Sequence, residues 1–320
     1  MLRWRGLDDV PADWGRCVVT IGVFDGVHRG HAQLIGRAIA EGKARNLPTV
    51  LMTFDPHPAE VVRPGSHPPQ LTTLTRRAEL AQELGIDVFC VMPFTPTLAA
   101  QPAEDFVHST LLERLHVAAV VVGDNFTFGY KALGDVAMLR TLGTRFGFTT
   151  DSVQLLTEHA VTYSSTYIRS CVDAGDVRAA AEALGRPHRV EGVVVRGDGR
   201  GRELGFPTAN VAPPMYAAIP ADGVYAARFT VLGPGPSVGQ VTTGESYPAA
   251  VSVGSNPTFS GRTRTVEAYV LDTSADLYGQ HVAVDFVDRI RGMVRFDSVD
   301  ALIDAMDGDV ERTRQIVGEA

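Results

Sequence analysis

Short apolar runs alternate with longer amphipathic stretches over the first 185 residues, and this alternation restricts the possible folds more than any other feature. The apolar runs lie at 17–23, 49–54, 87–92, 117–123 and, less clearly, 148–156. After the first run, apolar positions recur at helical spacing through residues 31–39, and residues 103–115 repeat that spacing. Strands that alternate with helices predict a parallel sheet covered on both faces, which is a Rossmann-like α/β/α domain.

The pattern changes near Gly185, where a short helix ends and Pro187 prevents its continuation. From residue 189 onward, runs rich in Val, Tyr and Phe are separated by Gly, Pro and Asn, with no helical spacing between them. These runs predict an antiparallel β-barrel, and the apolar positions from Val299 to Ile316 predict one or two terminal helices packed on it. We therefore expect two domains, residues 1–185 and residues 186–320.

Composition excludes several classes of protein. The net charge is -8 and the basic residues are dispersed, which does not suit a nucleic-acid groove. The N-terminus lacks a secretory apolar segment, and the longest apolar run, at 117–122, is too short to cross a bilayer. Cys17, Cys90 and Cys171 lie far apart, which argues against a zinc site or a disulfide framework. We expect a cytoplasmic protein, a monomer or weak homo-oligomer, that acts on small molecules without a nucleic-acid or membrane partner.

The stretch VVTIGVFDGVHRGH, at residues 18–31, places two histidines where a strand turns into a helix. His28 and His31 can point the same way above the first helical turn, where free N–H groups and the helix dipole favour an anion. Gly22 and Gly30 allow close approach of the backbone, and Asp25 can cap or orient the turn. This arrangement suits nucleotidyl transfer, in which negative charge builds on the attacked α-phosphate. The chain has neither G-K-[ST] nor G-x-G-x-x-G, which excludes a P-loop NTPase and a dinucleotide-dependent dehydrogenase.

A second polar pattern, GVVVRGDGRGRELGFPTAN, follows at residues 192–210. Its glycines, Gly197, Gly199 and Gly201, fit either a flexible hairpin or a loop that binds phosphate. Thr208 and Asn210 occupy alternate positions of a strand, so their oxygens face the same way and suit one hard metal, Mg²⁺ with ATP phosphates.

Glu267 is a carboxylate on an otherwise apolar strand, TVEAYVLD. Because Thr265 and Tyr269 share its face, we expect Glu267 to look into the barrel. A carboxylate in that position can take the proton of a substrate hydroxyl during phosphoryl transfer. A solvated glutamate on an edge strand is the alternative interpretation.

The motifs together resemble one enzyme family. GVFDGVHRGH is similar to the His-x-Gly-His signature of nucleotidyltransferases, and TFDPHP at 53–58, GDNFTFG at 123–129 and SSTYIRS at 164–170 agree with that family in order and spacing. The glycine-rich segment, Glu267 and RGMVRFDSVDALIDAM at 291–306 resemble a riboflavin kinase module. Over residues 15 to 318, the chain thus resembles the prokaryotic bifunctional riboflavin kinase/FAD synthetases.

The resemblance implies two ATP-dependent reactions, riboflavin to FMN in a C-terminal kinase barrel and FMN to FAD, with release of pyrophosphate, in an N-terminal FMN adenylyltransferase domain. It implies catalytic roles for His28 and His31 in the adenylyltransferase, and for Glu267 as the base acting on the ribityl hydroxyl. Implied nucleotide contacts are Gly22, Phe24, Asp25, Asn125, Ser164, Ser165, Thr166, Arg169, Gly197, Gly199, Gly201, Thr208 and Asn210, of which Thr208 and Asn210 also hold Mg²⁺. Implied flavin contacts are Asp124, Phe126, Phe128 and Phe206.

Two alternatives are a nucleotidyltransferase for another phosphorylated alcohol, with a barrel that only binds a product, and a flavin-binding regulator without activity. The first leaves the second set of motifs without a purpose. A regulator needs neither a base nor a pair of metal ligands, so Glu267, Thr208 and Asn210 argue against the second.

Overall fold

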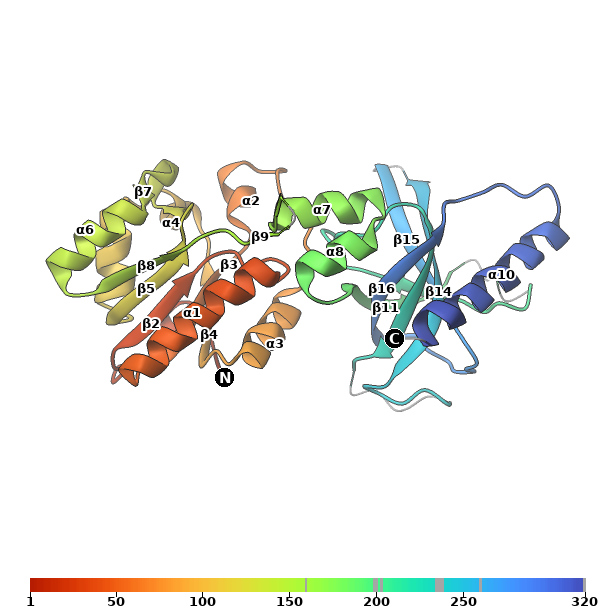
Figure 1. The fold of residues 1–320 in the computed structure, drawn as a ribbon, viewed down its shortest axis with the longest axis horizontal. Helices are drawn as coiled ribbons and strands as arrows, with labels where there is room; N and C mark the ends of the chain where they lie inside the picture. The colour runs from red at the N-terminus through yellow and green to blue at the C-terminus, as the bar shows by residue number, and fades with distance from the viewer. Residues whose placement is uncertain (159, 198–200, 202–203, 234–238, 259–260, 319–320) are drawn as a thin grey trace. The chain divides into compact units, whose positions relative to one another are not determined.

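The computed structural model describes residues 1–158, 160–197, 201, 204–233, 239–258 and 261–318. The chain divides into two compact units, the first made of Met1–Pro68 and Leu74–Ser164 and the second of Pro69–Thr73 and Ser165–Ala320 (Figure 1). The sequence suggested a boundary near 185, whereas α7 (Ser165–Ala174) and α8 (Val177–Leu184) group with the second unit. Contacts with the barrel explain the difference, since Ala221 N–H donates to Val172 O at 3.2 Å and Arg178 pairs with Asp288 at 2.6 Å.

A six-stranded parallel sheet, in the order β1-β4-β3-β2-β5-β8, forms the centre of the first unit. Its strands are β1 (Leu2–Arg5), β2 (Cys17–Ile21), β3 (Thr49–Asp55), β4 (Val88–Pro93), β5 (Val117–Gly123) and β8 (Thr149–Val153). Every predicted apolar run forms one of these strands. The sequence did not predict β1, because this edge strand is only four residues long and buries a single side chain, Trp4.

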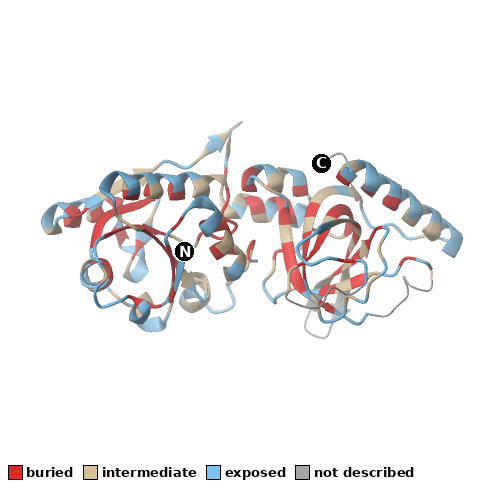
Figure 2. Ribbon diagram, turned by 90° about the horizontal axis from the view of Figure 1, so that it is seen from below, coloured by how far each residue is buried: buried red, intermediate tan, exposed pale blue. Residues whose placement is uncertain are grey.

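Helices cover both faces of this sheet, as predicted. Alternate strand residues pack in opposite directions, so Val18 and Leu51 contact the layer of α1 (Arg29–Arg45) and α3 (Leu74–Leu84). Val19 and Met52 belong to the core beneath α5 (Ala103–Phe106), the π-helical η2 (Val107–Leu112) and α6 (Val136–Phe146). Figure 2 shows the buried residues on the strands and on the helix faces turned toward them. The single helix predicted at 103–115 is therefore the α5–η2 pair.

Short elements complete the first unit and form much of the rim around the strand ends. They are η1 (Leu7–Asp9), α2 (Pro58–Val62), α4 (Pro96–Ala99), β6 (Thr127–Phe128), η3 (Tyr130–Ala132), β7 (Gly134–Asp135), β9 (Thr157–Glu158) and β10 (Val161–Thr162). No described helix is both long enough and apolar enough to span a membrane.

The second unit contains a closed antiparallel barrel in the order β11-β12-β15-β14-β13-β16, which confirms the predicted architecture. Its strands are β11 (His188–Val195), β12 (Ala209–Ala212), β13 (Gly223–Val231), β14 (Ser246–Thr258), β15 (Gly261–Val270) and β16 (His281–Arg291). One terminal helix, α10 (Val299–Gly318), packs on the barrel. Arg291 fixes it with a bidentate pair to Asp309, at 2.9 Å from Nε to Oδ1 and 2.7 Å from Nη2 to Oδ2.

The three cysteines are free thiols in buried positions. Burial raises the pKa of both Cys17 and Cys90 to about 12. Both thiols therefore stay protonated at neutral pH and serve as small core residues.

Gly175, which follows α7, tests the contact between that helix and the barrel. Its φ of +77° is unfavourable for other residues, and a Cβ would lie 2.7 Å from Tyr225 Oη and 3.0 Å from Arg289 Nη1. We expect Gly175→Ala to lower the free energy of unfolding by about 3 kcal/mol, from left-handed strain plus overpacking. Urea unfolding followed by circular dichroism measures the change.

Gly279 supplies the matched control, because it has the same φ of +77° in the same unit and a Cβ there would meet nothing within 4 Å. Gly279→Ala should cost about 1 kcal/mol from strain alone. Equal destabilisation by the two substitutions would contradict the proposed packing of Tyr225 and Arg289 against Gly175.

Candidate active sites

The turn between β2 and α1 brings the two predicted histidines into contact. His28 is the N-cap of α1, and its Nδ1 accepts a hydrogen bond from the His31 backbone N–H at 3.3 Å. The rings of His28 and His31 stack with centroids 3.6 Å apart and planes at 20°. A Cβ on Gly30 would lie 3.2 Å from the His28 ring, so glycine leaves room for this stack. The imidazoles thus lie at the positive end of a 17-residue helix, where an anion is favoured.

A buried ion pair holds the backbone of this turn. Asp25 is 2% exposed and accepts a hydrogen bond from Nη2 of Arg77, which is 3% exposed, at 3.2 Å. Nη1 of Arg77 also donates to Val23 O at 2.9 Å, and Thr53 Oγ1 donates to the same carbonyl at 2.9 Å. Asp25 therefore orients the turn while His28 caps the helix. Sequence reasoning missed Arg77, although an arginine on the apolar face of a helix was a signal.

Phe24 is a buried residue that packs against the histidine pair. Its ring is 1% exposed and meets the His31 ring edge-on at 5.3 Å. A Cβ on Gly22 would lie 3.2 Å from the Phe24 ring, so Gly22 and Phe24 fit each other. Direct nucleotide contacts by these two residues and by Asp25 stay predictions.

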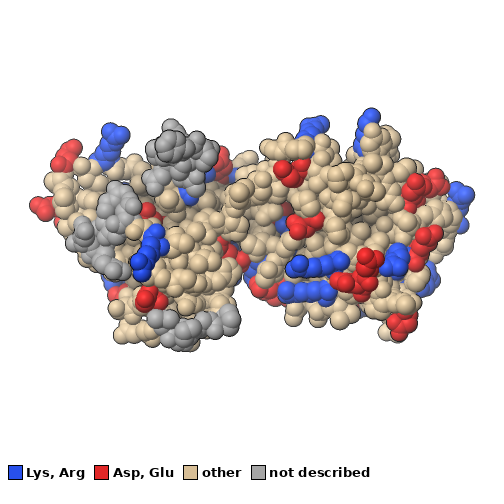
Figure 3. Space-filling view, turned by 180° about the vertical axis from the view of Figure 1, so that it is seen from behind, with Lys and Arg blue, Asp and Glu red and all other residues tan. Residues whose placement is uncertain are grey.

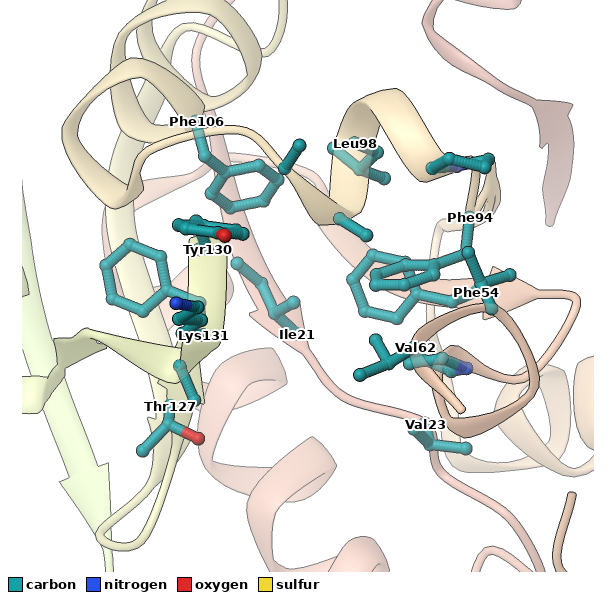
Figure 4. A pocket seen from close by; sticks show the side chains of 18 of the residues that line it. Ile21, Val23, Phe54, Val62, Phe94, Leu98, Phe106, Thr127, Tyr130 and Lys131 are labelled. Carbon is teal, nitrogen blue, oxygen red and sulfur yellow. The ribbon is translucent and has the colours of Figure 1, made fainter. Parts of the chain in front are cut away.

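An apolar cavity of about 850 Å³ opens at the carboxyl ends of β2, β3, β4 and β5 (Figure 4). Among the residues that line it are Ile21, Gly22, Val23, Phe54, Phe94, Phe106, Phe126 and Phe128. Phe126 and Phe128 stack with centroids 5.6 Å apart, and Phe54 meets Phe94 edge-on at 5.5 Å. Such a cavity suits a flat aromatic ring system, because apolar walls and aromatic faces bind one well.

The two polar residues that precede Phe126, Asp124 and Asn125, do not belong to the cavity wall. Asp124 and Asn125 are exposed and do not line the cavity, in contrast to Phe126 and Phe128. Asp124 is held by its backbone N–H, which donates to Val153 O at 3.0 Å. The flavin contact of Asp124 and the nucleotide contact of Asn125 stay predictions.

The residues of SSTYIRS lie around the start of α7. Ser164 closes the first unit, whereas Ser165, Thr166 and Arg169 belong to α7 in the second unit. Arg169 Nε donates to Pro69 O at 2.6 Å within that unit. Phosphate contacts by these four residues stay predictions.

Glu267 does not look into the barrel, and that expectation is wrong. Val266, Ala268 and Val270 fill the barrel interior at 6% exposure or less, so the alternation of β15 places Glu267 on the outer face, half-buried. Asn210 of β12 lies directly opposite Glu267 in the strand pairing. Residues paired across neighbouring strands share a face, so the predicted base and one predicted metal ligand lie side by side.

Gly197 and Gly201, two described residues of the glycine-rich segment, lie close to the two predicted metal ligands. A Cβ on Gly197 would clash with the Asn210 side-chain amide, and a Cβ on Gly201 would lie 3.6 Å from Thr208 Oγ1. The absence of side chains at Gly197 and Gly201 therefore leaves a cradle around Thr208 and Asn210. Gly199 lies outside the described residues.

Two further features surround this second site. Phe206 is 8% exposed and meets Tyr269 edge-on at 5.4 Å, in a cluster with Leu271 and Val310 of α10. A cavity of about 610 Å³ is lined by Thr208, Tyr269 and residues 273–278, among others. The flavin contact of Phe206 stays a prediction, and the cavity shows space beside Thr208 that is large enough for part of a nucleotide.

The described residues hold no group of three or more His, Cys, Asp or Glu side chains that could bind a metal ion. The hydroxyl and amide oxygens of Thr208 and Asn210 are hard ligands, and two such ligands suffice for Mg²⁺ where phosphate oxygens and water complete the shell.

The paired histidines above a parallel sheet define a nucleotidyltransferase-type unit, and the closed barrel with its outward carboxylate defines a kinase-type unit. Residues 10–167 match the family model of FAD synthetase, and residues 184–317 match that of riboflavin kinase. The bifunctional riboflavin kinase/FMN adenylyltransferase of Escherichia coli (strain K12) is 37% identical over 302 residues, 94% of this chain and 93% of the relative. That of Haemophilus influenzae is 33% identical over 311 residues, 97% of each chain.

A solved structure agrees with this assignment of the fold. It comes from Streptococcus pneumoniae, is described as a macrolide-efflux protein, and is 31% identical with a TM-score of 0.86 over 98% of this chain and 99% of its own. The chain belongs to the family of bifunctional riboflavin kinase/FMN adenylyltransferases, which confirms the resemblance drawn from the motifs.

The Arg77–Asp25 pair gives a test of how the histidine turn is held. We expect Arg77→Met to lower the free energy of unfolding of the first unit by about 3 to 5 kcal/mol, because it removes the arginine that pairs with the buried Asp25 carboxylate. Fluorescence of Trp4 and Trp14, which both belong to this unit, reports its unfolding.

Arg76, the preceding residue of α3, is the control, because two carboxylates with which it pairs, Glu79 at 2.9 Å and Glu83 at 3.1 Å, are solvent-exposed. Arg76→Met should cost less than about 1 kcal/mol. A cost for Arg77→Met no larger than this would show that the buried pair does not hold the turn.

Proposed function

We propose that the chain makes FAD from riboflavin in two ATP-dependent steps, the first at the barrel and the second at the parallel sheet. One observation carries the proposal: two sites with different chemistry lie on separate units of one chain. The stacked pair of His28 and His31 suits an anion. The facing pair of Glu267 and Asn210 combines a base with a metal ligand.

At the parallel sheet, an oxygen of the FMN phosphate attacks the α-phosphate of ATP and pyrophosphate leaves. Nδ1 of His28 accepts a hydrogen bond from the backbone N–H of His31, so the proton of the neutral ring lies on Nε2. Nε2 is therefore the atom that donates a hydrogen bond to a phosphate oxygen. Preorganised donors of this kind stabilise the charge that develops on the transferring group. The cavity lined by Phe54, Phe126 and Phe128 holds the isoalloxazine ring.

At the barrel, the ribityl hydroxyl of riboflavin gives its proton to Glu267 as its oxygen attacks the γ-phosphate of ATP, and ADP leaves. Thr208 and Asn210 would hold Mg²⁺ together with the phosphates, and the cradle beside Gly197 and Gly201 supports that placement. When bound, Mg²⁺ neutralises charge on the β- and γ-phosphates. Glu267 lies on the outer face of the barrel, so substrates reach it without entering the filled interior.

We further propose that these reactions occur in the cytoplasm, on small molecules alone, by a monomer or weak homo-oligomer. Three free thiols support a reducing compartment. On the face drawn in Figure 3, basic and acidic side chains are intermixed rather than gathered into a basic patch, and the net charge is -8. The intermixed charges and the negative net charge support the absence of a nucleic-acid partner.

The kinase base is tested by Glu267→Gln, which keeps the shape of the side chain and removes its basicity. We expect kcat for riboflavin phosphorylation to fall at least about 100-fold. The conversion of supplied FMN to FAD should be unchanged, because that reaction uses the other unit. Chromatography that resolves the three flavins measures both rates.

Glu245→Gln is the control, because Glu245 is an exposed carboxylate of the same unit that contacts Tyr247 at 2.8 Å. It should leave both rates unaltered. Loss of FAD formation from FMN in Glu267→Gln would overturn the assignment of two separate sites.

The histidine pair is tested by His28→Asn, because asparagine preserves the N-cap of α1. Removal of a donor to the transferring phosphate should slow FAD formation from FMN about 100-fold or more. Riboflavin phosphorylation should stay at the wild-type rate. His108→Asn, on the exposed side of η2, is the control and should change neither reaction.

An unchanged FAD rate in His28→Asn would contradict the role of the histidines. Parallel loss of kinase activity would instead indicate a general defect in folding, which the unfolding transition of the same sample distinguishes.

A further inference from the structure

Among the described residues, the wall of the apolar cavity at the parallel sheet carries charge of one sign. Arg63 and Lys131 are the charged side chains among its lining residues in the described part of the chain, and no described carboxylate lines it. The whole chain carries a net charge of -8, which repels an anion. Two cations at the edge of an apolar cavity therefore attract an anion locally, in contrast to the chain as a whole. Such a cavity favours a ligand with an aromatic body and an anionic end.

Lys131 is unusual in the sequence as well. Lys43 and Lys131 are the two lysines among 29 basic residues, and all the others are arginines. Lys43 lies in the last turn of α1, away from the cavity. The Lys131 ammonium lies 5.1 Å from the centroid of the Tyr130 ring, and it forms no ion pair with a described carboxylate.

The loop that carries Lys131 is held in a conformation that lysine does not prefer. Lys131 and Ala132 have φ of 54° and 56°, in the left-handed region where asparagine or glycine fits with less strain. Tyr130 N–H anchors the loop by donating to Gln101 O at 2.8 Å, and a Cβ on Gly129 would lie 2.6 Å from Ala103 Cα. Strain of this kind persists where surrounding structure imposes it, and it gathers at ligand clamps.

The loop lies over one wall of the cavity. Figure 4 shows Lys131 and Tyr130 on one side and Phe54 and Phe94 on the other, with Ile21 between them. Gly22 and Val23, which lead into the histidine turn, line the same cavity. A ligand that fills the cavity therefore meets the aromatic walls, the Lys131 loop and the approach to the histidines together.

We infer that Lys131 selects the phosphorylated flavin at this site, by pairing its ammonium with the phosphate of FMN. The inference rests on the proposed adenylyl transfer and adds the residue that distinguishes FMN from a flavin without phosphate. A charge-assisted contact acts on the phosphate alone, whereas the aromatic walls act on every flavin. Lys131 thus sets the affinity for FMN without changing the affinity for the ring system.

The test compares Lys131→Asn with wild type in the conversion of supplied FMN to FAD. Asparagine suits the left-handed backbone, so the thermal midpoint should not fall. We expect KM for FMN to rise about tenfold, since one charge-assisted contact is lost. Lumiflavin, which has no hydroxyl or phosphate and so cannot be phosphorylated, serves as the competitive probe. Its inhibition constant and KM for ATP should be unchanged.

Lys43→Asn is the matched control, because it removes the other lysine and changes the net charge equally. It should leave KM for FMN at the wild-type value. An unchanged KM for FMN in Lys131→Asn, or equal weakening of FMN and lumiflavin, would overturn the inference. So would a rise in KM for ATP alone. If wild type makes no FAD from FMN, the proposed function itself fails, and that outcome is separate.

Discussion

Burial of both faces of the parallel sheet decides where the first unit can carry out chemistry. Its central strands are apolar along almost their whole length, because α1 and α3 cover one face and η2 and α6 cover the other. Polar groups are therefore confined to the strand ends. The histidine turn, the aromatic cavity and the Lys131 loop all lie along the carboxyl edge, where ligands of such sheets bind. The buried Arg77 fixes the backbone there, so the histidines keep their place.

Burial also decides where the barrel can bind substrates, but here the buried region is the barrel interior. A barrel of six strands has an interior filled by side chains, here valines, alanines and aromatic residues, so the interior offers no room for substrates. The proposed kinase site lies on the outer face, where strand pairing sets Val195, Asn210 and Glu267 in one row across β11, β12 and β15. Gly197, which follows β11, lies against Asn210, and the absence of a side chain at this glycine leaves space beside the row.

Sequence reasoning predicted the architecture well, because strand and helix periods are properties of short segments. The strands of the parallel sheet other than β1, the closed barrel and the approach of His28 to His31 followed from such patterns. The side of β15 that faces the barrel interior could not be predicted from such patterns. Alternation identifies which residues share a face, but it does not identify which face is buried. Val266, Ala268 and Val270 form the more apolar set, and that comparison would have placed Glu267 outside.

Other features depend on contacts between distant segments and leave weak traces in the sequence. Arg77 and Asp25 are 52 residues apart, and nothing in either segment alone predicts their pairing. The grouping of α7 and α8 with the barrel follows from contacts such as that of Val172 with Ala221. Lys131 was passed over for a related reason, because its position beside the cavity depends on how a hairpin folds over Ala103.

The central claim is that one chain carries a flavin through two successive reactions at two sites. The most direct measurement is a timed chromatographic assay of the purified chain with riboflavin, ATP and Mg²⁺. The account predicts that FMN appears first and that FAD follows as FMN is consumed. Accumulation of FMN without any FAD, or no consumption of riboflavin while supplied FMN is still converted to FAD, would contradict it.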